Sequence, residues 1–416
     1  MDLFVIITSI FAIASLFSFI NARYIKLPGV IGVMIMAILT SLLTIFAGKT
    51  FPRVSGFISE LTGSIDFSKT LLDVMLGFLL FASALHFDIK KLKNSLSGIM
   101  IISTVGVVIS TLIFGGILHY LLTTFGIEIP FIYCLLFGAL ISPTDAVAVA
   151  ALLKRSKMPA RLETIISGES LFNDGIGLVL FVSFLEVAQT PDKGFSFLEA
   201  GQLFGQEVFG GLALGLAMGW VAFLMMRSIK DFQTVLMLSI TLVMVISVIS
   251  GILHVSIPLA VVAAGLLLSS KSISKEETSE FNQYLEKIWS LMDELLNTIL
   301  FVMIGLQMVI MKFNLAFLWI GLAGIVILLL ARALSIIAPV ILVRRSLKLD
   351  YSSITILTWG GLRGGISVAM ALSLPPSSYR DMILSGCFVI VVFSIIVQGL
   401  TLNPLVNKLV KDGDER

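Results

Sequence analysis

The stretch from Thr164 to Phe181 reads TIISGESLFNDGIGLVLF and sets two carboxylates, Glu169 and Asp174, among residues apolar enough to lie in lipid. An ionised acid at the centre of a bilayer costs about 3 kcal/mol on insertion scales, so it is retained where it faces protein or water and handles ions or protons. The stretch therefore predicts a membrane-spanning helix that carries a functional site.

The composition of the whole chain agrees with a membrane protein. Hydrophobic residues make up 57% of the 416 residues and charged residues 13%, against about 45–50% and about 25% in soluble domains. Cys134 and Cys387 both fall in apolar runs, so we expect them to pack there rather than to form a disulfide. The net charge of +2 is uninformative by itself, and we expect a lipid bilayer and no nucleic acid among the partners.

Apolar runs long enough to cross a hydrocarbon core of about 30 Å recur along the chain. They predict an all-α, polytopic membrane protein with about thirteen transmembrane helices of the usual 17–25 residues. The runs lie near residues 3–20, 28–47, 68–87, 95–123, 130–153, 162–189, 201–226, 232–253, 256–270, 289–311, 314–343, 351–374 and 382–407. The polar insert at 271–288 is interpreted as a short amphipathic surface helix or a solvated connector.

The distribution of positive charge predicts an orientation. Most of the 28 Lys and Arg residues fall in loops on one predicted side, and positive charge collects in cytoplasmic loops. This asymmetry predicts an amino terminus outside and a carboxyl terminus in the cytoplasm, and we expect the chain in the inner (plasma) membrane of the cell. Arg332 and Arg363 are the exceptions, because both lie inside predicted spans.

An internal repeat is the next signal. Residues 71–76 (LLDVML) resemble residues 291–296 (LMDELL), about 220 positions later, and such repeats mark many secondary transporters. Val147-Ala148-Val149-Ala150 against Ile366-Ser367-Val368-Ala369 gives nearly the same offset, as does Ser167-Gly168 against Ser385-Gly386. An odd number of crossings between the copies predicts an inverted-topology repeat.

Two spans at matching places in the two copies contain helix breakers. Pro143 interrupts the fifth span, where a proline removes a backbone donor and clashes with the preceding turn. Glycines surround Arg363 in the twelfth span, within the sequence GGLRGG at 360–365, and let the backbone leave helical geometry. The pair predicts two broken, crossing helices whose unwound carbonyls and half-helix ends face a bound ion.

These motifs carry a family resemblance. The sequences SPTDAVAV at 142–149, GESLFNDG at 168–175 and GLRG at 361–364 resemble the signature of the monovalent cation/proton antiporters, in the NhaP and sodium/proton exchanger branch. One departure is Ala146, where many relatives have proline. The resemblance implies a secondary antiporter, not an enzyme, that exchanges Na⁺, with Li⁺ or K⁺ open, for H⁺ without a cofactor and serves pH homeostasis.

The resemblance also implies site residues. Asp174 would bind the cation or the proton, and Asn173, Ser170 and Thr144 would help to coordinate the cation. The chemistry agrees, because a hard cation prefers oxygen ligands, and Ser170 and Asp174 are four apart and so share a helix face. The metal-ligand set expected for a monovalent cation is Asp174, Ser170 and Thr144. For Asp145, a role in ion binding and a role in supporting the unwound segment both stay open.

Glu169 precedes Asp174 by five residues, so it points elsewhere on the helix and needs a partner. In the resembling family an acid at this position pairs with an arginine on the eleventh span, which here is Arg332. Arg363 is the alternative partner in a structural ion pair.

The resemblance further implies a mechanism and an architecture. A single unit over residues 1–416 would combine core helices near 95–189 and 314–407 with a dimerisation panel near 1–94 and 201–311. The core would slide against the panel of a homodimer and expose Asp174 to each side in turn. An asparagine at position 173, rather than a second acid, goes with electroneutral exchange.

Two other classes of protein fit parts of the pattern. A sodium- or proton-coupled symporter of an organic solute uses the same repeat and broken helices, and a large polar cavity would favour it. An intramembrane aspartyl protease would use Asp145 and Asp174, but the Gly-Leu-Gly-Asp context that such proteases need is absent.

Overall fold

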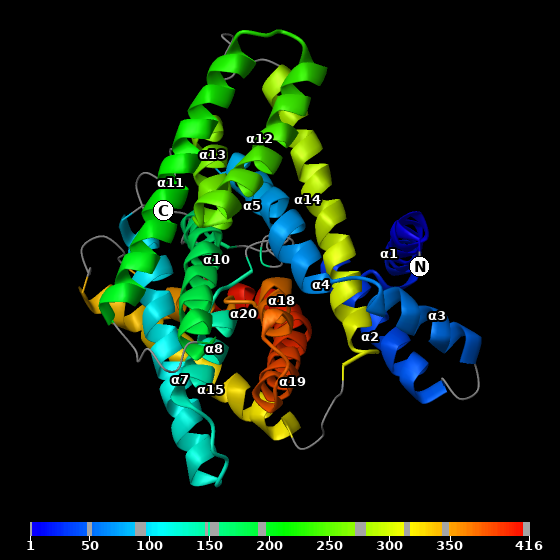
Figure 1. Ribbon diagram of the computed structural model, residues 1–416, viewed down its shortest axis with the longest axis vertical. Coiled ribbons are helices and arrows are strands. Elements are labelled where there is room, and N and C mark those ends of the chain that lie inside the picture. Colours follow the sequence, from blue (N-terminus) through cyan, green and yellow to red (C-terminus); the bar gives the residue numbers. More distant parts are fainter. Residues whose placement is uncertain are drawn as a thin grey trace.

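The regular secondary structure of the computed structural model is helical throughout the part that it describes (Figure 1). The described residues are 2–47, 52–87, 97–145, 149, 158–189, 197–270, 280–311, 317–342 and 349–410. The prediction of an all-α fold is therefore confirmed. Half of the insert predicted at 271–288, residues 271–279, lies outside the described residues, as do Val147, Ala148 and Ala150 of the repeat.

The helices follow the predicted apolar runs in order. Their bounds are α1 Leu3–Ile20, α2 Gly29–Ala47, α3 Pro52–Gly63, α4 Phe67–Lys69, α5 Leu76–Leu85, α7 Val107–Thr124, α8 Phe131–Ile141, α10 Ala160–Gln189, α11 Phe197–Arg227, α12 Phe232–Leu253, α13 Ile257–Ser270, α14 Glu280–Gln307, α15 Leu318–Leu342, α17 Tyr351–Trp359, α18 Gly365–Ser373, α19 Ser378–Phe393 and α20 Gly399–Leu409. Short π-helical segments interrupt several of them, among them η2 at Thr70–Met75 and η6 at Ser394–Gln398.

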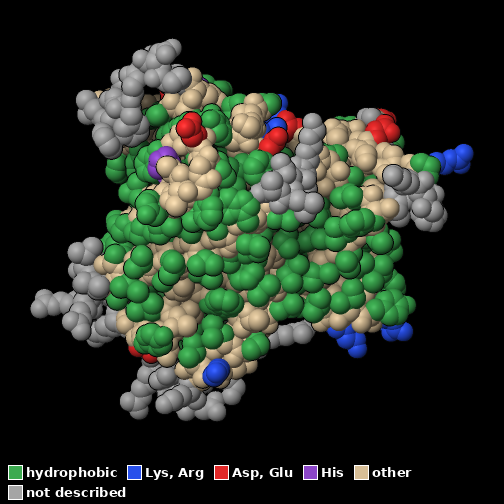
Figure 2. All heavy atoms as spheres, turned by 90° about the horizontal axis from the view of Figure 1, so that it is seen from below, with side chains coloured by type: hydrophobic (Ala, Val, Ile, Leu, Met, Phe, Trp, Pro, Cys, Tyr) green, Lys and Arg blue, Asp and Glu red, His purple; other side chains and the backbone are tan. Residues whose placement is uncertain are grey.

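Ten of the described helices are long and apolar enough to cross a membrane, and α8 and α13 are shorter apolar helices. Figure 2 shows the matching surface, an apolar band with its charged side chains near the two edges. A surface of this kind suits contact with lipid chains in the middle and with water at both edges. The number of thirteen crossings stays a prediction, as does the inverted repeat.

Helix α3 lies in a stretch that the apolar runs had left as a loop. It begins at Pro52, a residue favoured in the first helical turn because its missing N–H has no partner to lose there. Its 12 residues bury Ile58, Leu61 and Thr62 along one side. A helix of this length rises about 18 Å, too short to span the hydrocarbon core, which is why the search for spans missed it.

The helices pack in two groups. In the first group, α14 contacts α1, α2 and α5, and α1 also contacts α2. Helix α5 packs against α13, which in turn contacts α11 and α12. The second group joins α7 to α8 and α15, and α15 and α18 to α19. Figure 1 shows α11, α12 and α14 reaching the upper part of the view, with α7, α15 and α19 in its lower half. Helix α10 contacts members of both groups and thus lies between them.

The contact between α11 and α13 is built on small residues. Gly211, Gly215 and Gly219 recur every fourth residue on α11, so they form one stripe along the helix. A Cβ atom at Gly215 would overlap the backbone of Ala260, and one at Gly219 would come within 3.0 Å of the Cα atom of Ala264. Small residues let two helix backbones approach closely, so that the helices gain van der Waals contacts with each other that they would not make with lipid.

This contact predicts that Gly215→Ala lowers the thermal stability of the detergent-purified protein, since overpacking costs about 1–3 kcal/mol. Gly205→Ala on the same helix is the control, because no atom lies within 4 Å of the Cβ position there. Thermal unfolding measured by intrinsic fluorescence should show a fall of several degrees for the first variant only. Equal melting temperatures would mean that α11 and α13 do not approach as described.

Candidate functional site

The two predicted broken helices meet where each one unwinds. Helix α8 ends at Ile141, and the chain between α17 and α18 is non-helical from Gly360 to Gly364. The backbone N–H of Asp145 donates to the carbonyl of Leu362 at 2.7 Å. Where a helix unwinds, its backbone groups lose their partners within the helix, and lipid offers none. This hydrogen bond between the two segments satisfies one such N–H and one such carbonyl.

Arg363 links the same two segments. Its Nη1 donates to the carbonyl oxygens of Ser142 and Pro143, at 2.6 Å and 2.7 Å, and its side chain is fully buried. These carbonyls belong to the end of α8, where unpaired carbonyls carry partial negative charge. The guanidinium therefore acts as a positively charged cap on the interrupted helix.

A hydrogen-bonded chain from η6 holds the other side of this break. Ser394 Oγ accepts from the backbone N–H of Arg363 at 2.9 Å and donates to Gln398 Oε1 at 2.6 Å. Gln398 Nε2 in turn donates to the carbonyl of Trp359 at 3.0 Å. Both side chains are buried, and the sequence analysis had assigned neither of them a role.

The start of α17 is fixed by an N-cap. The Asp350 carboxylate accepts from the backbone N–H of Ser353 at 3.0 Å and also from its hydroxyl. The hydroxyl bond, helped by the backbone bonds, holds the pKa of Asp350 below its usual range. The contribution of this cap to stability is thus present above the ordinary pKa of an aspartate and is lost as the pH falls through the lowered value.

Thr144 fastens the unwound end of α8 to α10. Its hydroxyl lies 2.7 Å from Ser170 Oγ and accepts from Asn173 Nδ2 at 2.7 Å. Its backbone N–H donates to Asn173 Oδ1 at 3.3 Å. All three residues are buried. The structure thus brings together three of the predicted cation-site residues, in a hydroxyl and amide network.

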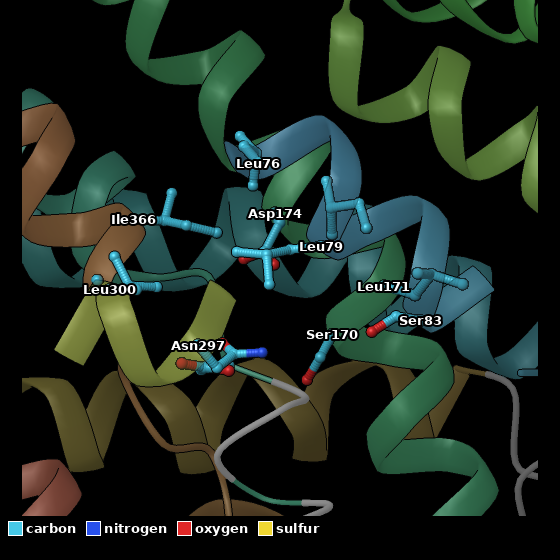
Figure 3. Close-up of a pocket in the computed structure, with 12 residues that line it drawn as sticks. Leu76, Leu79, Ser83, Ser170, Leu171, Asp174, Asn297, Leu300 and Ile366 are labelled. Carbon is cyan, nitrogen blue, oxygen red and sulfur yellow. The ribbon is translucent and has the colours of Figure 1, made fainter. Parts of the chain in front are cut away.

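Asp174 lies one residue further along α10 and faces a cavity (Figure 3). Only 6% of the residue is exposed. Four segments besides α10 supply the walls, and the lining residues are Leu76, Leu79, Leu80, Ser83, Asp145, Ser170, Leu171, Asp174, Asn297, Leu300, Gly365 and Ile366. Half of the lining residues are leucine or isoleucine, and five others carry a side-chain oxygen.

The predicted residues divide between lining the cavity and supporting it. Asp174, Ser170 and Asp145 line the cavity, whereas Asn173 and Thr144 bond to each other beside it. Asn297 of α14 also lines the cavity, and the sequence analysis had not selected it. Its only sequence signal was an amide in an otherwise apolar run, LLNTILFV at 295–302.

Glu169 and Arg332 form a buried ion pair. Arg332 Nη2 donates to Glu169 Oε2 at 2.7 Å, and Nη1 donates to Oε1, which gives a two-pronged geometry. The side chains are 1% and 6% exposed. Arg332 Nη2 also reaches the carbonyl of Leu357 on α17, at 3.4 Å. Of the two arginines proposed from the sequence, the structure places Arg332 against Glu169 and Arg363 against backbone carbonyls.

The amino-acid sequence is similar to those of known transport proteins. The chain is 39% identical to the Na(+)/H(+) antiporter NhaP of Pseudomonas aeruginosa, over 97% of this chain and 96% of that protein. It is 29% identical to the Na(+)/H(+) antiporter NhaH of Halobacillus dabanensis, over 93% of each. The relatives are transporters, not enzymes.

A solved structure has the same fold. The sodium proton antiporter MjNhaP1 from Methanocaldococcus jannaschii, determined at pH 8, superposes with a TM-score of 0.76 over 98% of this chain and 99% of that chain. The two sequences are 19% identical, so this likeness concerns the fold.

The profile of the transmembrane sodium/hydrogen exchangers matches residues 9–408. This match spans nearly the whole chain, as does the similarity to the Pseudomonas protein. The chain is therefore an integral membrane protein that belongs to the sodium/hydrogen exchanger family.

Proposed function

We propose that this protein is a secondary antiporter that exchanges Na⁺ for H⁺ and that Asp174 binds both ions in turn. The observation that carries the proposal is a buried carboxylate in a cavity, beside the oxygens of Ser170 and Asp145, where two broken helices meet. The named activity of the Pseudomonas and Halobacillus relatives supports it. Li⁺ and K⁺ are the other candidate cations.

Exchange needs only competition at one acid. A carboxylate that holds a proton is neutral and binds a cation poorly, whereas a carboxylate that holds a cation excludes the proton. If the site crosses only when occupied, each cation that leaves is replaced by a proton. Asn173 adds no charge to the site, so the cycle carries one charge in each direction and is electroneutral.

Asp145 takes the supporting role in this proposal. Its backbone N–H holds Leu362, and a Cβ atom at Gly364 would overlap its carboxylate, so Asp145 lies at the crossing of the two broken helices. Its carboxylate also lines the cavity and adds negative potential there.

Alternating access by sliding suits the two packing groups. The core would comprise residues near 95–189 and 314–407, with a panel near 1–94 and 201–311 that pairs with a second copy. The second packing group contains α7, α8, α15, α18 and α19, and all of them fall in the core ranges. The amino terminus would lie outside and the carboxyl terminus in the cytoplasm.

Symport of an organic solute is less well supported. A solute site would need a large cavity with many polar groups, whereas aliphatic side chains and a glycine make up most of this wall.

Asp174→Asn should abolish cation-dependent proton flux and leave the protein folded, because an amide cannot take up and release a proton. The measurement is Na⁺-driven proton flux in sealed proteoliposomes. Asp381→Asn, which removes an exposed carboxylate near the start of α19, should keep the wild-type rate. Flux in Asp174→Asn above about a tenth of the wild-type rate would contradict the assignment, because it would show that exchange does not need a titratable group at position 174.

Asn173→Asp should make exchange sensitive to membrane potential or stop it. The new carboxylate can accept a hydrogen bond from the Thr144 hydroxyl, 2.7 Å away in the native pair, so the fold need not change. One extra charge moved across the membrane couples to about 2.3 kcal/mol per 100 mV. Rates should be measured under valinomycin-imposed potentials. An active variant whose rate ignores the potential would refute the electroneutral role of Asn173.

Glu169→Gln and Arg332→Gln should each lower thermal stability strongly, because an unpaired buried charge costs about 3–5 kcal/mol. The double variant should be closer to wild type than the sum of the singles, with a coupling above about 1 kcal/mol. The matched cycle of Glu169→Gln with Arg363→Gln should be nearly additive. A larger coupling with Arg363 would mean that Glu169 pairs with Arg363. Additivity in both cycles would mean that Glu169 forms neither ion pair.

A further inference from the structure

Asn297 is the buried amide that the proposed exchange leaves without a role. It lies on α14, a helix outside the two broken segments and outside α10, yet it lines the same cavity as Asp174, Ser170 and Asp145 (Figure 3). Only 2% of the residue is exposed. An amide buried in an apolar wall costs free energy unless its polar atoms are satisfied, so its placement needs a reason.

The hydrogen bonds of Asn297 fix the orientation of its amide. Nδ2 donates to the backbone carbonyl of Asp293 at 2.8 Å and to Asp293 Oδ1 at 3.0 Å. Both partners are acceptors, so the atom facing them is the nitrogen, and its two hydrogens are used there. Among the hydrogen bonds of the described residues, those of the Asn297 side chain use Nδ2, and none uses Oδ1. The amide oxygen is thus the atom of this side chain that remains for a ligand.

We propose that the Asn297 amide oxygen is a further ligand of the transported cation, presented by Asp293, so that α14 completes the site. The inference rests on the proposed function. Alkali cations take neutral amide oxygens readily, and the side-chain oxygens on α10 supply ligands from a different side of the cavity. Because the amide carries no charge, it adds a ligand to the cation without altering the exchange of one cation for one proton.

The test is a titration of Na⁺-driven proton flux in proteoliposomes of the full chain. Asn297→Leu should raise the KM for Na⁺ at least about five-fold, the worth of one ordinary polar contact, and leave the maximal rate within about two-fold. The ratio of the KM values for Li⁺ and Na⁺ should change as well. Thr298→Val is the control, since the Thr298 hydroxyl donates to the carbonyl of Glu294 on its own helix and does not line the cavity.

A purely structural role for Asn297 would lower the melting temperature and the maximal rate at an unchanged KM and an unchanged Li⁺/Na⁺ ratio, and this result would overturn the inference. If Asn297→Leu does not fold, Asn297→Ser decides by the same two readouts, because it keeps a small polar group but withdraws the oxygen from the cavity. A wild-type protein without Na⁺-driven proton flux would instead refute the proposed function itself. Wild-type exchange with unchanged KM in the Asn297 variants refutes this inference alone.

Discussion

Backbone groups released by an unwound helix must find partners inside the protein, because lipid offers none. At the centre of this molecule two unwound stretches supply partners for each other, through the hydrogen bond from Asp145 to Leu362 and through the Arg363 guanidinium on the carbonyls of Ser142 and Pro143. Each break thus supplies partners that the other uses, and Ser394 and Gln398 of η6 add partners for the break between α17 and α18. The position of the cavity, with Gly365 at the start of α18 in its wall, follows from this mutual dependence.

The two buried acids of α10, Glu169 and Asp174, have different surroundings. Glu169 has both carboxylate oxygens on Arg332, so its charge is compensated within the protein. Asp174, five residues later on the same helix, faces the cavity instead. Under the proposed function, the charge of the Glu169–Arg332 pair would stay the same while a cation and a proton alternate at Asp174. The pair also ties α10 to α15, since each helix contributes one partner.

Sequence reasoning succeeded where the physical signal is local. Apolar runs located the helices, and Pro143 with the glycines around Arg363 located both breaks, because proline and glycine act on the backbone at their own positions. It failed where the signal depends on which helix comes near. Asn297 is an unremarkable amide in an apolar run until α14 packs against the cavity, and Ser394 and Gln398 acquire their roles only beside the break. The sequence analysis did not select the glycine stripe of α11, whose role depends on the approach of α13.

The capping of α8 by Arg363 bears on how a site here could select ions by size. The sequence had suggested that unwound carbonyls would face the cation, but the carbonyls of Ser142 and Pro143 are turned toward a guanidinium. The oxygens proposed to hold the cation belong to side chains on α10, on α14 and at the end of α8, and Ser170 and Asn297 among them are held by hydrogen bonds of their own. The size of such a site depends on how closely these segments pack, unlike that of a ring of backbone carbonyls within one loop. Under the proposed function, contraction around Li⁺ or expansion around Na⁺ would require these segments to move as well. The choice between the two ions would then depend on the energy of moving these segments together with the energy of removing water from each ion.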